Sequence, residues 1–336
     1  ALGAAVAGGS IRRSLERTFR YRHEITAADL ERHGLAGGRQ LRVAVTGAGG
    51  LVGKALCAFL GTGGHDVRRL VRREPTADDE IEWDPATGDL HPRSRLEGLD
   101  AVVHLAGENI AAGRWSPAQK ARIHDSRAVG TGRLARALAD LERPPRTLVS
   151  ASAIGFYGAR GEEDVTEDSG PGADFLATTA VEWEAEAARA MDLGMRVVNL
   201  RTGIVLGLGG GALDQMLLPF RLGLGGPLGD GHQWWSWIHV RDVVRMILAA
   251  IDEGWSGAYN VTAPHPERQG DFARILGRTL GRPAIIPAPA FAVKTLFGEF
   301  STELLNGKRI LPQRARDAGF EWDFERLDVA LADLVG

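Results

Sequence analysis

The segment that most constrains the fold of this chain is residues 41–60, LRVAVTGAGGLVGKALCAFL. It opens with alternating apolar residues, a pattern typical of a β-strand. Glycines then recur at three-residue spacing, and beyond them the apolar residues recur at helical intervals. Strand, glycine turn and helix in this order predict a dinucleotide-binding βα unit. The glycines let the backbone approach a pyrophosphate, and the helix N-terminus offers free N–H groups to it.

The spacing of these glycines is GxxGxxG, whereas the common dinucleotide fingerprint is GxGxxG. The alternative interpretation is a glycine-rich turn that holds no ligand, but the flanking strand and helix favour nucleotide binding. The residues of this turn that we predict to contact the cofactor are Gly47, Gly50, Leu51, Val52 and Gly53.

The composition is that of an ordinary globular protein with no marked charge. The chain has 336 residues, of which 44% are hydrophobic and 25% charged, and its formal net charge is −3. This balance gives no reason to expect nucleic acid or an anionic membrane as a partner, and no apolar run reaches the ~20 residues of a membrane span. Cys57 is the only cysteine, which fits a reducing compartment, so we expect a cytoplasmic protein.

Residues 1–40 precede the first predicted strand and do not belong to a nucleotide-binding fold that starts at Leu41. Ile11, Leu15 and Phe19 have helical spacing, and Thr26 has the position of an N-cap for a second helix. We interpret residues 1–40 as a terminal helix and linker. The chain begins with alanine and not with methionine, so one interpretation is that it is a fragment of a longer protein.

Further apolar segments alternate with helical ones along the chain. A long helical pattern at 116–141, with Pro117 near its start, separates two of them. This alternation predicts an α/β fold, a doubly wound parallel sheet of the Rossmann type. The segments predicted as strands after the first are 66–71, 80–83, 101–107, 147–152, 195–207 and 258–262.

The end of the second predicted strand bears on the choice of cofactor. An NAD site places an acid there, about 20 residues past the glycines, to bond the ribose 2′-hydroxyl. This chain instead has Arg72 and Arg73, whose guanidinium groups suit a 2′-phosphate, so we predict NADP(H). The alternative is that both arginines are only solvated. Asp84, after the third strand, could approach the adenine edge or simply stabilise a turn.

The pattern changes after Gly207. Residues 207–235 are rich in glycine and tryptophan and include a predicted helix at 212–222, and two amphipathic helices lie beyond residue 263. We therefore predict a smaller C-terminal, α-rich domain on the substrate side. The predicted division is a linker at 1–40, an NADP-binding Rossmann domain at 41–206 plus 236–262, and the small domain at 207–235 plus 263–336.

Several of these segments together resemble the extended short-chain dehydrogenase/reductase superfamily. TGAGGLVG, HLAG, SASAIGFYG, LRTGIVLG and GDGHQWWSWIHVRDV occur in that superfamily's order. More closely, the chain resembles the atypical epimerase-family branch, whose members end in a short C-terminal domain of unassigned function. The first 40 residues resemble the linker of longer members that carry a ligand-binding helix-grip domain upstream. The small residues Ala106 and Gly107 at the end of the fourth strand leave room for a cofactor. Leu105, Arg201 and Thr202 are further predicted cofactor contacts.

The superfamily's usual catalytic pair is absent. Its members commonly use a tyrosine with a lysine four residues later, which together supply a phenolate as general base. No Tyr-x-x-x-Lys exists in this chain, and Leu176 and Ala180 occupy the two places. Sugar-nucleotide epimerases of this kind also carry an arginine where Trp235 stands. The loss of this cation argues against a sugar-diphosphate ligand. Trp234, Trp235 and Trp237 suggest an apolar or planar small molecule, and the alternative is that they are core anchors.

The remaining candidates for chemistry lie near the ends of the predicted strands. Ser152 stands where the superfamily places an active-site hydroxyl, although it could equally cap a turn. Glu108 and Asn109 follow the fourth strand and face the same crevice, and Glu108 is the best remaining acid or base. Tyr157 is a poor base without a lysine, because its pKa would stay near ~10. Possible supporting residues are Asp125, Arg127 and His239, and no cluster has metal-ligand spacing.

Two classes of function remain open from the sequence. The first is an NADP(H)-dependent oxidoreductase or epimerase that uses other acid/base groups on a small molecule. The second is a non-catalytic protein that senses NADP(H). The absence of Tyr and Lys favours the second, and the intact crevice with Ser152, Glu108 and Asn109 favours the first. We expect a monomer or homodimer.

Overall fold

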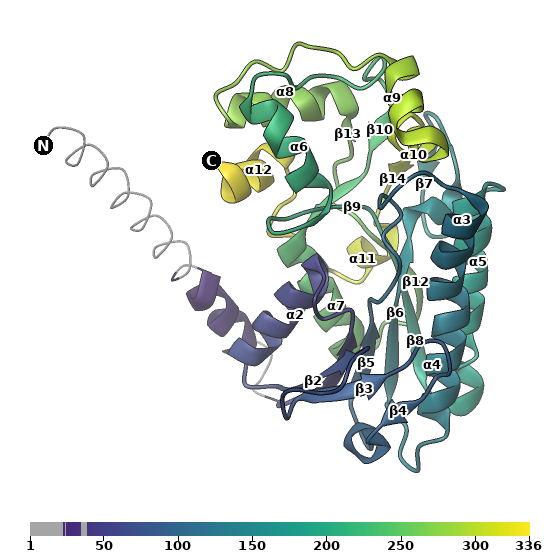
Figure 1. The fold of residues 1–336 in the computed structure, drawn as a ribbon. Coiled ribbons are helices and arrows are strands. Elements are labelled where there is room, and N and C mark those ends of the chain that lie inside the picture. Colours follow the sequence, from purple (N-terminus) through teal and green to yellow (C-terminus); the bar gives the residue numbers. More distant parts are fainter. Residues whose placement is uncertain (1–22, 24, 35–38) are drawn as a thin grey trace, which may run out of the picture.

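The computed structural model describes residues 23, 25–34 and 39–336, and its centre is an eight-stranded sheet (Figure 1). The strand order is β12-β8-β6-β5-β1-β2-β3-β4, and every neighbouring pair is parallel except β3 and β4. The strands are β1 (Arg42–Thr46), β2 (Asp66–Val71), β3 (Glu80–Trp83), β4 (Leu90–His91), β5 (Ala101–His104), β6 (Thr147–Ala153), β8 (Arg196–Thr202) and β12 (Gly257–Val261).

The predicted doubly wound sheet is confirmed, with one addition at its edge. The two-residue strand β4 runs antiparallel to β3 and was not expected. It forms because the chain turns back at Asp84, whose carbonyl accepts from the N–H of Gly88 at 2.7 Å and whose N–H donates to the carbonyl of Asp89 at 3.0 Å.

Successive residues of the central strands bury their side chains on opposite faces of the sheet. On one face, Val43 and Val45 join a core cluster formed with helices α2 (Leu51–Thr62) and α7 (Val240–Asp252). On the other face, Ala44 joins a cluster formed with α4 (Gly130–Ala139). This period of two is what a strand covered on both faces requires.

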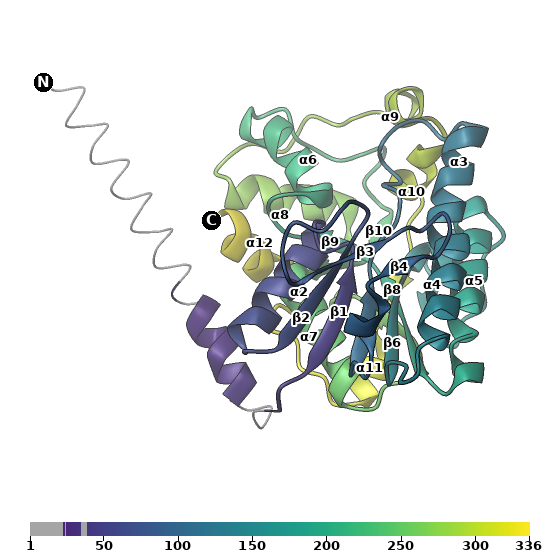
Figure 2. The same ribbon diagram turned by 60° about the horizontal axis from the view of Figure 1, so that its bottom comes forward.

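The predicted helix at 116–141 is three consecutive segments. Ser116 caps α3 (Pro117–His124), its Oγ accepting from the N–H of Gln119 at 3.2 Å. A π-helical turn, η2 (Asp125–Val129), connects α3 to α4, and α5 (Phe175–Ala188) packs against both η2 and α4. Figures 1 and 2 show α3, α4 and α5 side by side on one face of the sheet and α2 with α7 on the other.

A third hydrophobic cluster lies beyond the carboxyl ends of the strands. It combines Trp235 and Trp237 with residues of the helices α6 (Gly211–Arg221), α8 (Gln269–Thr279) and α12 (Leu327–Val335). Most of the cluster lies in segments that the sequence assigns to the small domain, but Leu206 and Trp237 come from the segments assigned to the Rossmann domain. Ala315, Phe320 and Trp322, which the sequence also assigns to the small domain, instead pack into the core of the central sheet.

The remaining elements are short. The two-stranded pairs are β7 (Asp164–Val165) with β14 (Arg309–Ile310), β9 (Ile204–Leu206) with β11 (Trp237–His239), and β10 (Trp234–Trp235) with β13 (Glu267–Arg268). The remaining helices are η1 (Arg93–Leu96), η3 (Ile154–Tyr157), η4 (Met191–Leu193), α9 (Ala290–Phe297), η5 (Gly298–Phe300), α10 (Ser301–Leu305) and α11 (Gln313–Asp317). Within the described ranges, no helix is long and apolar enough to cross a membrane.

The predicted N-terminal segment is described only in part. Residues 25–34 are helical, and this helix already includes residue 25, so Thr26 is not its N-cap. His33 docks it on the sheet domain, with Nε2 at 2.9 Å from the carbonyl oxygen of Phe59. The helical pattern from Ile11 to Phe19 lies outside the described residues.

Candidate cofactor crevice

The three glycines after β1 have different structural roles. Gly47 has φ +69°, and a Cβ there would lie 2.8 Å from the backbone carbon of Leu105. A Cβ on Gly53 would lie 2.2 Å from the carbonyl oxygen of Gly47. Gly50 is less crowded, since its Cβ would lie 3.3 Å from that same oxygen. The turn itself therefore requires Gly47 and Gly53, whereas Gly50 leaves its outer side free for close approach by a ligand.

The N-terminus of α2 fits an anionic group. Gly50 is its N-cap, no side chain caps the helix, and its first turn contains no acidic residue. The first backbone N–H groups, of Leu51, Val52 and Gly53, therefore face the crevice together with the positive end of the helix dipole. This is the arrangement that accepts a dinucleotide pyrophosphate.

Thr46 joins the carboxyl ends of β1 and β5 at the floor of the crevice. Its Oγ1 accepts from the N–H groups of Leu105 and Ala106, each at 3.1 Å, and lies 2.7 Å from Nδ1 of His104. The hydroxyl thus donates to Nδ1, which assigns the proton of a neutral imidazole to Nε2. Complete burial lowers the pKa of His104 to about 4, so the ring is neutral at physiological pH.

The two arginines after β2 do not share one environment. Arg73 donates to both carboxylate oxygens of the buried Glu80, at 2.7 and 2.9 Å, and this interaction lowers the pKa of Glu80 to about 2. Arg72 is exposed, and no residue in the described part of the chain bonds to its side chain. Arg72 is consequently the guanidinium that is free to meet a 2′-phosphate. Asp84 accepts from the N–H of Ala86 at 2.7 Å, which is the turn-stabilising arrangement.

Ser152 and Tyr157 belong to one buried polar network. The hydroxyl of Ser152 donates to Glu184 at 2.6 Å. The hydroxyl of Tyr157, which is fully buried, donates to Asn260 at 2.7 Å and accepts from Arg201 at 2.9 Å. Burial raises the pKa of Tyr157 to about 12. At neutral pH even less of Tyr157 is ionised than of an ordinary tyrosine, so less phenolate is available as a base.

Arg201 belongs to the same network. Its Nε and Nη2 each lie 2.8 Å from an oxygen of Glu184, so the pair is bidentate. This guanidinium is used inside the protein and is not placed to hold a cofactor, and Thr202 donates its hydroxyl to the carbonyl of Leu200 at 3.1 Å. Sequence reasoning missed Glu184. Its position in the sequence could have indicated it, because Glu184 is four residues after Ala180 and therefore lies on the same face of α5.

The end of β5 carries polar side chains outside that network. Glu108 is half-buried, with Oε1 accepting from Gln119 at 3.3 Å and lying 3.7 Å from Nε of Arg122. Asn109 is exposed and accepts from the N–H of Ala111 at 2.9 Å. Arg127 completes the cluster and interacts electrostatically with Glu108. Glu108 and Asn109 thus directly follow Gly107, and their hydrogen bonds are separate from those of Ser152 and Tyr157.

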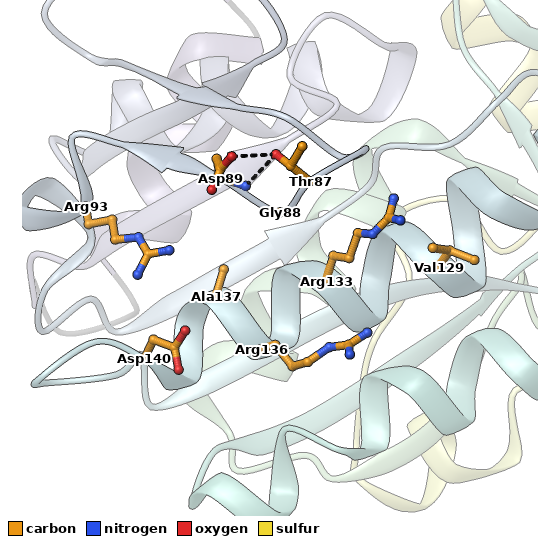
Figure 3. A pocket seen from close by; sticks show the side chains of 9 residues that line it. All are labelled: Thr87, Gly88, Asp89, Arg93, Val129, Arg133, Arg136, Ala137 and Asp140. Atoms are coloured by element: carbon orange, nitrogen blue, oxygen red, sulfur yellow. Dashed lines mark hydrogen bonds between the residues drawn. The ribbon is translucent and has the colours of Figure 1, made fainter.

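Other candidates fall outside this crevice. A pocket of about 420 Å³ lies between the turn at 87–89 and α4, and none of its lining residues, which Figure 3 labels, is a predicted site residue. His239 caps α7, its Nδ1 accepting from the N–H of Arg241 at 3.2 Å, which is a structural role. Among the residues that the structure describes, no group of acidic, histidine or cysteine side chains could hold a metal ion.

The fold and the crevice together define a Rossmann-type protein of the dinucleotide-binding class. A sequence profile of the NAD dependent epimerase/dehydratase family matches residues 43–262, and a domain of unknown function, DUF1731, matches residues 288–334. The chain therefore belongs to the NAD dependent epimerase/dehydratase family. The resemblance found in the sequence is confirmed, including the short C-terminal domain without an assigned function.

Named relatives are similar to this chain over most of its length. The epimerase family protein Mb2239 of Mycobacterium bovis is 42% identical over 86% of this chain and 96% of its own. The chloroplastic SDR39U1 homolog of Arabidopsis thaliana is 38% identical, over 87% of this chain and 86% of its own. The crystal structure of human SDR39U1 isoform 2 with NADPH superposes with a TM-score of 0.80 at 36% identity, over 88% of this chain and 99% of that one. The cofactor predicted from Arg72 and Arg73 is thus the one bound in that human structure.

Proposed function

We propose that this protein binds NADP(H) in the crevice between β1 and β5 and catalyses hydride transfer to or from a small molecule, with Glu108 as the proton donor or acceptor. The observation that carries the proposal is the position of Glu108. It follows the carboxyl end of β5, where open α/β sheets bind their ligands, and its carboxylate is outside the buried network that holds Ser152 and Tyr157.

The residues around the crevice support distinct roles. The N–H groups at the start of α2 would hold the pyrophosphate, and Arg72 would pair with the 2′-phosphate. NADP(H), when bound, supplies or accepts the hydride. Asn109 would orient the reacting oxygen through its amide, and Glu108 would exchange a proton with that oxygen. Gln119 and Arg122 would keep the Glu108 carboxylate in position.

The substrate that we propose is a small molecule with an apolar or planar part. Support comes from exposed apolar side chains on the two helices seen at the open end of the sheet in Figure 1, Leu218 on α6 with Phe291 and Leu296 on α9. The tryptophans contribute less than the sequence suggested, because Trp235 and Trp237 are buried in the core of the C-terminal region.

A second candidate is a non-catalytic NADP(H) sensor. The observation that favours it is the loss of the superfamily's base: Leu176 and Ala180 stand in the Tyr and Lys places, and the nearby Tyr157 is fully buried. A sensor would keep the glycine turn and Arg72 while dispensing with a proton donor. The two candidates therefore differ in whether Glu108 has a chemical role.

The decisive comparison is between Glu108→Gln and Tyr157→Phe. Wild type and both variants would be assayed for NADPH oxidation and NADP+ reduction against a panel of ketones, aldehydes and alcohols. We expect Glu108→Gln to lower turnover by roughly 100-fold or more, because general acid–base catalysis typically accelerates a reaction by at least that factor. Tyr157→Phe should change turnover little while lowering the free energy of unfolding by about 1–3 kcal/mol, the cost of unpaired buried partners.

The reverse order of effects would reject Glu108 and restore Tyr157 as the proton group. If no member of the panel is turned over and NADPH still binds, the sensor candidate is supported instead.

A cytoplasmic location is also part of the proposal and rests on the single Cys57, although the Arabidopsis relative is described as chloroplastic. The proposed assembly is a monomer or homodimer.

A further inference from the structure

Arg127 places a guanidinium group against the backbone at the end of β5. It lies on the π-helical turn η2, and such turns occur frequently at functional sites. A Cβ on Gly107 would lie 3.5 Å from Cζ of Arg127 and 3.6 Å from both terminal nitrogens. The whole guanidinium is therefore packed beside Gly107, the residue that immediately precedes Glu108.

The hydrogen-bonding capacity of this group is largely unused. Nη1 of Arg127 donates to the carbonyl of Ile123 at 3.2 Å, and Cζ lies 5.3 Å from the ring centroid of Trp183. In the described part of the chain, Arg127 forms no ion pair with a carboxylate, in contrast to Arg201, which has Glu184. Burial lowers the pKa of Arg127 to about 10, so the group still carries its charge at neutral pH. Its remaining donors suit an anion.

The strand order of the sheet indicates which part of the crevice lies beside Arg127. β5 lies between β1 and β6, whereas Arg72 follows β2 on the other side of β1. A dinucleotide that puts its 2′-phosphate at Arg72 and its pyrophosphate at α2 extends its nicotinamide half toward β5. Arg127 and Glu108 would then stand together at the end of the crevice where a substrate meets the nicotinamide.

We propose that Arg127 binds a carboxylate or phosphate group of the substrate. This inference rests on the proposed function and narrows its substrate to small acids, whose anion is held by Arg127 while the reacting oxygen lies near Glu108. A bidentate anion would use the two terminal nitrogens in the fork geometry that carboxylates and phosphates share. The guanidinium lies beside Gly107 and near the ring of Trp183.

The test uses aromatic probes with and without an anionic group. Benzoate, phenyl phosphate and neutral benzamide would each be titrated calorimetrically into the NADP+-loaded protein, wild type and Arg127→Gln. We expect wild type to bind one or both anions at least about tenfold more tightly than benzamide, and Arg127→Gln to lose that preference. Binding of benzoate would indicate a carboxylate substrate, and binding of phenyl phosphate would indicate a phosphate substrate. Arg127→Lys should retain part of the preference, and Arg136→Gln, on the following helix, is the matched control and should retain all of it.

An unchanged preference in Arg127→Gln, or no preference in wild type, would overturn the inference. NADPH affinity is measured for every variant. A tenfold loss of NADPH affinity in Arg127→Gln with anion preference intact would also overturn it, because the cation would then serve the cofactor. Failure of the proposed function has a different signature, since turnover could be absent while NADPH and the anions bind as expected.

Discussion

At the scale of single residues, burial separates the side chains that could do chemistry from those that hold the fold. Ser152 and Tyr157 have the residue types of a catalytic pair, but their hydroxyls bond to Glu184, Asn260 and Arg201 inside the protein. Glu108 and Arg127 have less familiar types for this superfamily, and they keep unused hydrogen-bonding capacity beside the crevice. We therefore propose the second pair, and not the first, for acid–base chemistry and substrate binding.

His104 gives a residue-scale prediction about pH. Its pKa is about 4 in the folded protein against an ordinary value of 6.5, so the unfolded chain binds more protons between these values. Stability should consequently fall as pH drops below 6.5. The contribution of His104 to the free energy of unfolding should decrease by about 2 kcal/mol from pH 7 to pH 5.

The measurement is urea unfolding of wild type and His104→Asn at pH 7, 6 and 5. Subtracting the free energy of unfolding of His104→Asn from that of wild type at each pH cancels the contributions of the titrating groups that both proteins have. A wild-type stability that falls more steeply than that of His104→Asn would agree with a neutral buried imidazole. Parallel pH profiles would show that His104 does not resist protonation in the folded state.

At the scale of elements, the sequence predicted the strands well and their side-chain partners poorly. The β1–turn–α2 unit and β2 were foreseen because glycine spacing and apolar alternation are local signals. The partners were not, because an ion pair such as Arg73 with Glu80 depends on strand pairing. Similarly, Ser152 falls on the sheet face covered by α5, where Glu184 reaches it, and no local pattern contains that contact.

The glycine turn can be tested with three substitutions. Gly50→Val should abolish NADPH binding while the protein remains folded, because its side chain would intrude where the pyrophosphate approaches the backbone. Gly53→Ala should lower the melting temperature, because its Cβ would lie 2.2 Å from the carbonyl oxygen of Gly47. Gly49→Ala is the control, since no atom lies within 4 Å of the added Cβ. NADPH binding retained by Gly50→Val would mean that this glycine serves only the turn.

Helix α5 contributes a second element-scale prediction. Glu184→Ala leaves the buried Arg201 without its counter-charge, and breaking a buried pair in this way costs about 3–5 kcal/mol. Glu182→Ala is the matched control on the exposed face of the same helix, where Glu182 bonds His124, and it should cost at most about 1 kcal/mol. Chemical unfolding of the two variants is the measurement, and equal losses would contradict the assignment of Glu184 as a structural anchor.

At the scale of the whole molecule, the sheet brings the ends of β1, β2 and β5 to one edge, and the C-terminal region covers the space beyond it (Figures 1 and 2). The glycine turn, Arg72 and Glu108 come from separate segments and meet only through this topology. The overall architecture was predictable because each segment carries its own periodicity. The distribution of charge in the crevice was not, because it depends on which cations the fold neutralises internally.

A cofactor titration tests the central claim most directly. NADPH and NADH would be titrated into wild type, Arg72→Ala and Arg73→Ala, with nicotinamide fluorescence as the signal. We predict that wild type binds NADPH more tightly than NADH, and that Arg72→Ala loses roughly 1.5–3 kcal/mol of NADPH binding, about 10- to 150-fold, with little change for NADH. Arg73→Ala should lose less, because Arg73 is paired with Glu80. Equal affinity of wild type for the two cofactors, or unchanged NADPH affinity in Arg72→Ala, would contradict the account.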